Sequence, residues 1–125
     1  MTAARMTTIS VCTMCGDESG LPEDAARCPG RLLFDRLSQL IAGQYPSLTV
    51  KSAPCMAVCE RPVTVAFQAA GAWGYVIAGV DADRHIDDVV ATAFAIASSQ
   101  HGIPAMADRP LFFQEGVVCR VPPIA

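Results

Sequence analysis

The 125-residue chain has little charge and few aromatic side chains. Charged residues make up 17% of the sequence and aromatic residues 6%, whereas hydrophobic residues make up 52%. This composition excludes a disordered tail and predicts a single domain with a modest, alanine-rich core. The 9 Lys and Arg residues form no block, and the net charge is −3. We therefore expect no binding of nucleic acid.

A long hydrophobic run is also missing. The longest, VVATAFAIA over residues 89–97, falls well short of the roughly 20 residues that span a membrane. The opening MTAARMTTIS lacks the stretch of about 7–15 apolar residues of a secretory signal. A glycine-rich phosphate loop, a Ser/His/Asp arrangement, a nucleotide fingerprint and an internal repeat are absent as well. We therefore expect a cytoplasmic protein without a membrane segment and without the enzyme chemistries that these motifs serve.

Cysteine, by contrast, is abundant, and two close pairs account for most of the 6 cysteines. Cys12 and Cys15 lie in VCTMC, and Cys55 and Cys59 lie in CMAVC. Thiols stay reduced in the cytosol, so clustered cysteines there indicate metal binding or redox chemistry rather than a disulfide framework. Sulfur ligands in tetrahedral geometry favour zinc or an iron–sulfur cluster. The alternative is that the four thiols pack as small hydrophobic groups.

The hydrophobic periodicity predicts the element order β-α-β followed by β-β-α. The expected elements are strands over residues 7–12, 47–53, 63–69 and 72–79 and helices over residues 29–43 and 86–97. A tight turn at Ala70 and Gly71 joins the last two strands. We expect residues 1–102 to form the domain and residues 103–125 to form an irregular extension packed on it, because a free tail with so many apolar side chains would be a liability.

This element order predicts an α/β protein with a thioredoxin-like fold. Its centre is a mixed sheet of about four strands, flanked by helices, with a right-handed crossover in the first β-α-β unit. In that layout the loop after the first strand lies beside the loop before the third. Because these loops carry the two cysteine pairs, the fold predicts that the pairs contribute to one centre.

Two other chemistries compete for the polar residues. CTMC is also the spacing of a dithiol oxidoreductase that uses Cys12 and Cys15, although the acidic loop after Cys15 disfavours a thiolate. The segment DADRHIDD, residues 81–88, has the residue types of a carboxylate–histidine metal site. We favour a helix N-terminus there, because acidic residues complement the helix dipole and cap free N–H groups.

The residues around the cysteines also resemble a known group of proteins. The strand ending in VC, the nearby second cysteine, and CMAVCERPVTVAF followed by GAWGYVIAG resemble the thioredoxin-like 2Fe–2S ferredoxins. That group includes a small subunit of respiratory NADH dehydrogenases. The chain is still more similar to a bacterial family of predicted metal-binding proteins that is often linked to cobalamin-biosynthesis genes. The ending RVPP extends this resemblance over nearly the whole chain.

The resemblance implies a 2Fe–2S cluster held by Cys12, Cys15, Cys55 and Cys59. It implies electron transfer or metal binding, with a redox partner protein or a metal-handling enzyme as the partner, and it allows a homodimer. A zinc- or cobalt-binding carrier that uses the same thiols is the alternative function.

The identity of the second ligand stays open between two cysteines. In related ferredoxins this ligand can lie further along the loop, where Cys28 precedes Pro29 at a helix N-terminus, a position that favours a thiolate. We favour Cys15, because VCTMC matches the more similar family. Cys119 lies in the extension and is expected to be a structural or free thiol.

Overall fold

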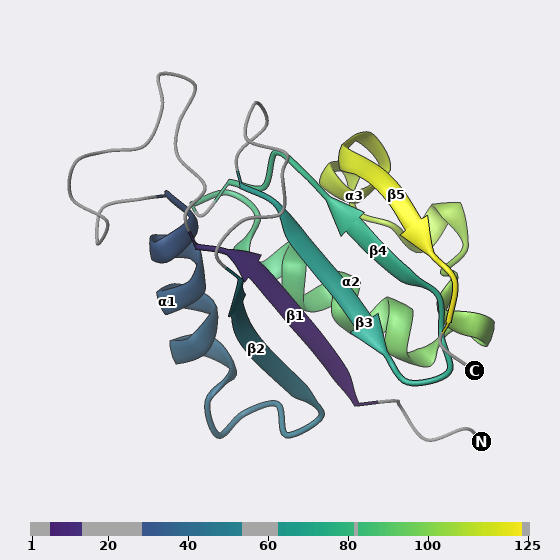
Figure 1. Cartoon of the computed structure of the whole chain (residues 1–125), viewed down its shortest axis with the longest axis horizontal. Coiled ribbons are helices and arrows are strands. Elements are labelled where there is room, and N and C mark those ends of the chain that lie inside the picture. Colours follow the sequence, from purple (N-terminus) through teal and green to yellow (C-terminus); the bar gives the residue numbers. More distant parts are fainter. Residues whose placement is uncertain (1–5, 14–28, 54–62, 82, 124–125) are drawn as a thin grey trace.

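The chain folds into a five-stranded mixed sheet with helices packed against it (Figure 1). A computed structural model describes residues 6–13, 29–53, 63–81 and 83–123. Its elements are β1 (Thr7–Cys12), α1 (Pro29–Ile41), β2 (Leu48–Ala53), β3 (Val65–Ala69), β4 (Gly74–Ile77), α2 (Ile86–Ser98), the short 3-10 helices η2 (Gln100–Gly102) and η3 (Met106–Asp108), α3 (Leu111–Gly116) and β5 (Val117–Val121).

The strands lie in the order β2-β1-β3-β4-β5. β1 and β2 are parallel and are joined through α1, whereas the other neighbouring pairs are antiparallel. The predicted order β-α-β, then β-β-α, is confirmed. The turn between β3 and β4 lies at Ala70 and Gly71 as predicted, closed by a hydrogen bond from the N–H of Ala72 to the carbonyl of Ala69 (3.2 Å).

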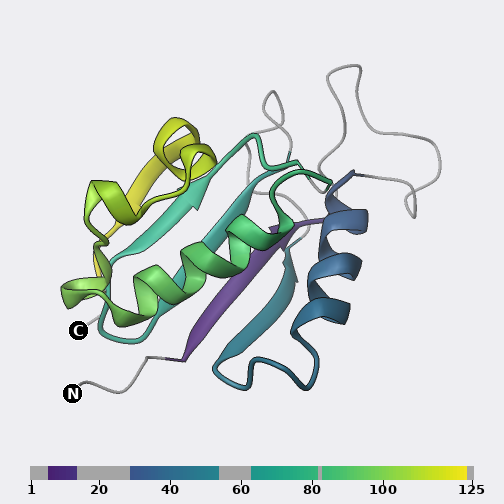
Figure 2. The ribbon, with the colours of Figure 1, turned by 180° about the vertical axis from the view of Figure 1, so that it is seen from behind.

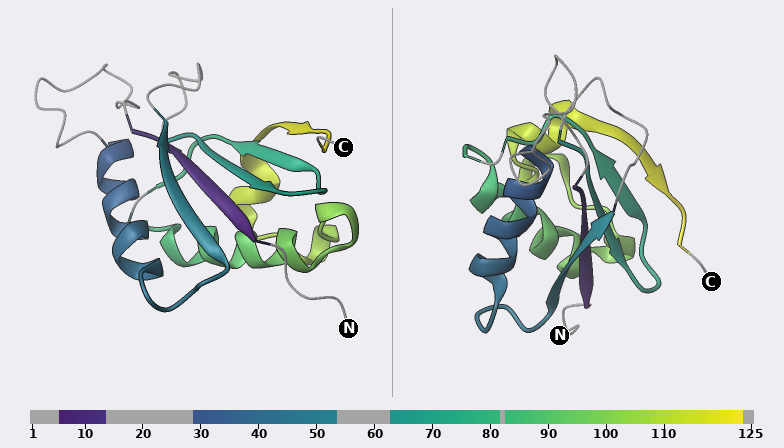
Figure 3. Two further views of the ribbon diagram at one scale, coloured as in Figure 1. Left: turned by 60° about the horizontal axis from the view of Figure 1, so that its bottom comes forward. Right: turned by 60° about the vertical axis from the view of Figure 1, so that its left-hand side comes forward.

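Both long helices cover the same face of the sheet, as Figure 2 and Figure 3 show. On α1, Leu33, Leu37 and Ile41 recur with helical spacing and are buried. On β1, the alternate residues Thr7, Ile9 and Val11 are buried, whereas the intervening Thr8 and Ser10 are half-buried. The core therefore lies between the helices and one face of the sheet. Its largest fully buried side chains are Tyr75, Phe67, Phe113, Ile9, Leu33 and Leu37.

The C-terminal segment contributes more regular structure than the sequence predicts. The expectation was an irregular extension and a sheet of about four strands, but α3 and β5 lie within this segment and β5 pairs with β4 as a fifth strand. Four successive side chains of β5, from Val118 to Val121, are exposed, so this edge strand lacks the alternation by which strands are recognised. Phe112 and Phe113 on α3 are buried and belong to the hydrophobic core.

None of the described helices is long and apolar enough to cross a membrane.

Candidate metal centre

β1 and β2 end side by side, and their ends define one edge of the sheet. Cys12, the last residue of β1, is the register partner of Ala53, the last residue of β2. The N–H of Thr13 donates a hydrogen bond to the carbonyl of Ala53 (2.8 Å), and the hydroxyl of Thr13 donates to the same oxygen (3.3 Å). We call this the carboxyl edge, defined by Cys12, Thr13, Ala53 and the adjacent Thr64. Parallel strands bring their carboxyl ends to the same side of a sheet, which explains this arrangement.

The segment that leads into β3 meets Cys12 from the other side. The N–H of Cys12 donates a hydrogen bond to the carbonyl of Thr64 (3.0 Å). Val63 and Val80 exchange two backbone hydrogen bonds of 3.2 and 2.9 Å, which fixes the chain just before Thr64. Cys12 therefore lies between Ala53 and Thr64, which are close to the two borders of segment 54–62.

The borders of the other cysteine-bearing segment lie at the same edge. β1 runs up to Thr13, and α1 begins at Pro29, near the end of β1 (Figure 1). Segments 14–28 and 54–62 therefore both leave and rejoin the described structure at the carboxyl edge. β1 and β3 are neighbours in the sheet, but the prediction that the two cysteine-bearing loops lie side by side falls outside the described residues and stays a prediction. Of the predicted ligands, the structure describes only Cys12. Cys15, Cys55 and Cys59 lie outside the described residues, as does the rival ligand Cys28.

Cys12 and Thr64 share an unusual environment at this edge. The side chain of Cys12 is 3% exposed and that of Thr64 is 0% exposed. Within the described parts of the chain, the buried hydroxyl of Thr64 has no hydrogen-bond partner. A buried thiol beside an unpaired buried hydroxyl fits a thiolate-bound metal, because buried polar groups normally find a partner. No feature of the sequence singles out Thr64, which lies within the predicted third strand but just before β3 as the structure has it.

Cys119 lies apart from this edge, on β5. It is exposed and is the register partner of Val76 on β4. Nothing in its surroundings among the described residues resembles the buried environment of Cys12. This fits the expectation that Cys119 is a structural or free thiol.

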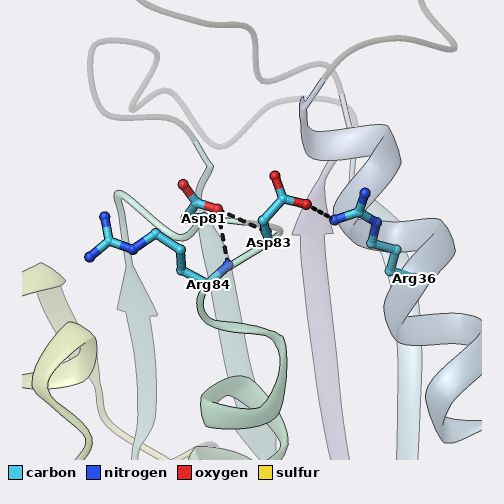
Figure 4. Close-up of polar contacts among 4 residues, drawn as sticks. All are labelled: Arg36, Asp81, Asp83 and Arg84. Atoms are coloured by element: carbon cyan, nitrogen blue, oxygen red, sulfur yellow. Dashed lines mark hydrogen bonds and ion pairs between the residues drawn. The ribbon is translucent and has the colours of Figure 1, made fainter.

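The acidic segment before α2 forms a capped turn (Figure 4). One carboxylate oxygen of Asp81 accepts hydrogen bonds from the N–H groups of Asp83 (2.8 Å) and Arg84 (3.1 Å). The hydrogen bond from Asp83 is the main reason why the pKa of Asp81 lies below its ordinary value of 3.8. The Nδ1 atom of His85 accepts the N–H of Asp81 (2.9 Å), and Asp83 forms an ion pair with Arg36 of α1.

These hydrogen bonds support the structural interpretation of DADRHIDD. Asp81 caps the turn that precedes α2, whereas Asp87 and Asp88 lie in the first turn of the helix, where they complement the helix dipole. Among the residues that the structure describes, no group of three or more His, Cys, Asp and Glu residues is arranged to hold a metal ion. The metal-site alternative for this segment thus has no support.

Comparison with known families decides where the chain belongs. The sequence profile of the family described as "Protein of unknown function (DUF1636)" matches residues 9–123. The chain belongs to the DUF1636 family. The match spans β1 through β5, so the C-terminal segment of this DUF1636 member is part of the family pattern. The comparison with curated proteins gives no match.

A solved structure confirms the fold of this DUF1636 member. The chain is similar to a structure described as a thioredoxin-like [2Fe-2S] ferredoxin from Aquifex aeolicus, with a TM-score of 0.60 and 14% sequence identity. The similarity covers 96% of each chain. The fold is therefore thioredoxin-like, as the element order predicts.

Proposed function

We propose that this protein is a small iron–sulfur protein that transfers electrons or binds metal. In this proposal a 2Fe–2S cluster is held by Cys12 and Cys15 from one segment and by Cys55 and Cys59 from the other. The proposed partner is a redox protein or a metal-handling enzyme. The observation that carries the proposal is the position of Cys12, buried at the carboxyl edge between the borders of the second cysteine-bearing segment.

Chain connectivity supports the meeting of the two pairs. Cys55 follows Ala53 by two residues in the sequence, and two residues of chain span at most about 7 Å. Ala53 is in turn the register partner of Cys12. Folding of the sheet therefore limits how far the first and third proposed ligands lie from each other. The thioredoxin-like [2Fe-2S] ferredoxin with the similar fold supports the choice of cluster.

The chain's own part in this function is to fix and shield the sulfur atoms. Cys12 ends a strand of the sheet interior that is hydrogen-bonded on both sides, so its sulfur is held by a rigid element. Its burial excludes water and raises the strength of local electrostatic interactions. A bound 2Fe–2S cluster supplies one-electron acceptance and release.

The environment of Cys12 argues against the dithiol oxidoreductase. An attacking cysteine needs an accessible thiolate, which in such enzymes typically lies at a helix N-terminus. Cys12 instead ends a β-strand and is 3% exposed. A zinc or cobalt carrier with the same thiols stays the second candidate, because closed sites of four thiolates suit zinc equally well.

Purification without oxygen tests the proposal. We expect a red-brown protein with visible absorption, iron and acid-labile sulfide. A colourless protein with one zinc favours the carrier, and a metal-free protein whose Cys12 and Cys15 cycle with a reductant favours the oxidoreductase.

Separate Cys→Ser variants then identify the ligands. Loss of the cluster is expected for Cys12, Cys55 and Cys59, and comparison of Cys15→Ser with Cys28→Ser names the remaining ligand. The matched control is Cys119→Ser, because Cys119 is exposed on β5 and its replacement is expected to leave the cluster intact.

A further inference from the structure

Thr64 has a buried hydroxyl that the described fold does not use. Its side chain is 0% exposed, and its Oγ1 atom has no hydrogen-bond partner among the described residues. Burying a hydroxyl without a partner is unfavourable, so such a group in a native protein normally has a partner, such as ordered water, an ion or a ligand. Among the residues that the structure describes, Thr92 of α2 is the other side chain with a buried hydroxyl that has no hydrogen-bond partner.

The strand register places this hydroxyl on the same face as the Cys12 sulfur. β1 and β3 are antiparallel, and the last pair of their ladder is Val11 with Val65. The hydrogen bond from the N–H of Cys12 to the carbonyl of Thr64 continues that ladder by one pair. Directly opposite residues of an antiparallel pair point to the same face, with Cβ atoms about 4.5–5.5 Å apart. Thr64 is therefore the cross-strand neighbour of Cys12.

Burial changes along this face toward the carboxyl edge. Alternation on β1 places Thr8, Ser10 and Cys12 on the face opposite Ile9 and Val11. Thr8 and Ser10 are half-buried, whereas Cys12 is 3% exposed. The cross-strand pair of thiol and hydroxyl thus lies in the most buried part of this face of β1.

We propose that the hydroxyl of Thr64 donates a hydrogen bond to the sulfur of Cys12 when metal is bound, and so positions that ligand and tunes the redox potential. The inference rests on the proposed function. A thiolate is a strong acceptor because it is charged. Hydrogen bonds to the sulfur ligands of iron–sulfur clusters stabilise the more negative, reduced state and so raise the potential. Thr64 is a positioning residue in this account, since it acts through Cys12.

The test compares Thr64→Val with Thr64→Ser in the metal-loaded protein and uses Thr92→Val as the matched control. The valine variants each remove one unpaired buried hydroxyl and keep the shape of the side chain, whereas serine keeps the hydroxyl. We expect Thr64→Val to lower the potential, with the equilibrium constant for reduction falling threefold to tenfold. A tenfold change in a one-electron couple corresponds to about 59 mV. Thr64→Ser and Thr92→Val are expected to keep the wild-type potential.

A second readout uses the metal-free protein and needs no cluster. In the metal-free protein each of these hydroxyls makes no hydrogen bond to a described residue that the substitution could remove. Thr64→Val and Thr92→Val should therefore both unfold at the same or a higher denaturant concentration than the wild type. If Thr64 had only a structural role, Thr64→Val would instead lower the stability of the metal-free protein, and the inference would be wrong. Thr64→Ala provides a second removal of the hydroxyl should the valine variant not fold.

The outcomes separate this inference from the proposed function. A wild type that assembles the cluster while Thr64→Val keeps its potential overturns the role of Thr64 and leaves the function standing. If the thiols bind zinc instead, the same comparison is made on the zinc dissociation constant, measured by competition with a chelator. A threefold to tenfold weaker constant for Thr64→Val supports the hydrogen bond, and an unchanged constant overturns it. A wild type that binds neither cluster nor zinc overturns both.

Discussion

Replacing Phe113 by Ala should remove a large part of the protein's stability. Phe113 lies on α3, in the C-terminal segment, and is 0% exposed. Its ring packs edge to face on Tyr75 of β4, with ring centroids 4.8 Å apart at an interplanar angle of 60°. The guanidinium of Arg109 also lies over the Phe113 ring, 5.1 Å from its centroid. The side chain therefore joins the segment after residue 102 to the centre of the core.

The size of the effect follows from this burial. Truncation of a fully buried Phe to Ala typically costs about 3–5 kcal/mol, of which the aromatic pair supplies about 0.5–1.5 kcal/mol. A domain of this size is stable by only about 5–15 kcal/mol. The loss of Phe113 is thus expected to leave a protein that is marginally folded at 37 °C.

Urea denaturation followed by circular dichroism measures this change, provided that the slope of the transition stays the same. The control is Leu111→Ala in the same helix, because Leu111 is 66% exposed and its truncation should change stability by no more than about 0.5 kcal/mol. Equal midpoints for Phe113→Ala and Leu111→Ala would refute the packing of the C-terminal segment on the core.

Three further changes test other parts of the fold. Gly116→Ala should cost about 1–3 kcal/mol in denaturation experiments, because its Cβ would lie 2.5 Å from the carbonyl oxygen of Ala78; unchanged stability would contradict that close approach. Asp81 has a lowered pKa, so its contribution to stability is present above pH 3.8 and is lost as pH falls through the folded-state pKa. The stability of Asp81→Asn should therefore fall less below pH 3.8 than the stability of the wild type. An equal fall in both proteins would contradict this role of Asp81. The exposed ion pair of Arg36 and Asp83 should contribute only about 0.2–1 kcal/mol to stability in a double-mutant cycle and less in high salt. A coupling energy above about 1 kcal/mol would contradict the expectation that solvent screens this exposed pair.

Local signals in the sequence predicted most of the fold. The spacing of Leu33, Leu37 and Ile41 indicated α1, and the glycine at position 71 marked the turn between β3 and β4, where its φ of +71° suits few other residues. β5 was missed for a physical reason. Its exposed side chains carry no alternation, and only its pairing with β4 makes it a strand.

The candidate site was likewise predicted only in part from the sequence. Cys12 was predicted as a ligand from its spacing to Cys15, and the structure places it at the carboxyl edge, where it is hydrogen-bonded to Thr64 and paired with Ala53. The ligand set itself stays a prediction, because its other members lie outside the described residues. Thr64 could not be recognised from the sequence, since its relation to Cys12 depends on the pairing of strands that are distant in the chain.

The pairing of the ends of β1 and β2 has a thermodynamic consequence for the proposed metal site. In an unfolded chain, bringing Cys12 and Cys55 together closes a loop of about forty residues, and the entropic penalty grows with the logarithm of that length. In the folded chain the parallel pairing of β1 and β2 already closes most of this loop, because Cys12 is the register partner of Ala53. Under the proposed function, a metal held by Cys12 and Cys55 binds a chain in which most of this loop is already closed, so it favours the native chain and raises the melting temperature with the logarithm of the metal concentration divided by the dissociation constant.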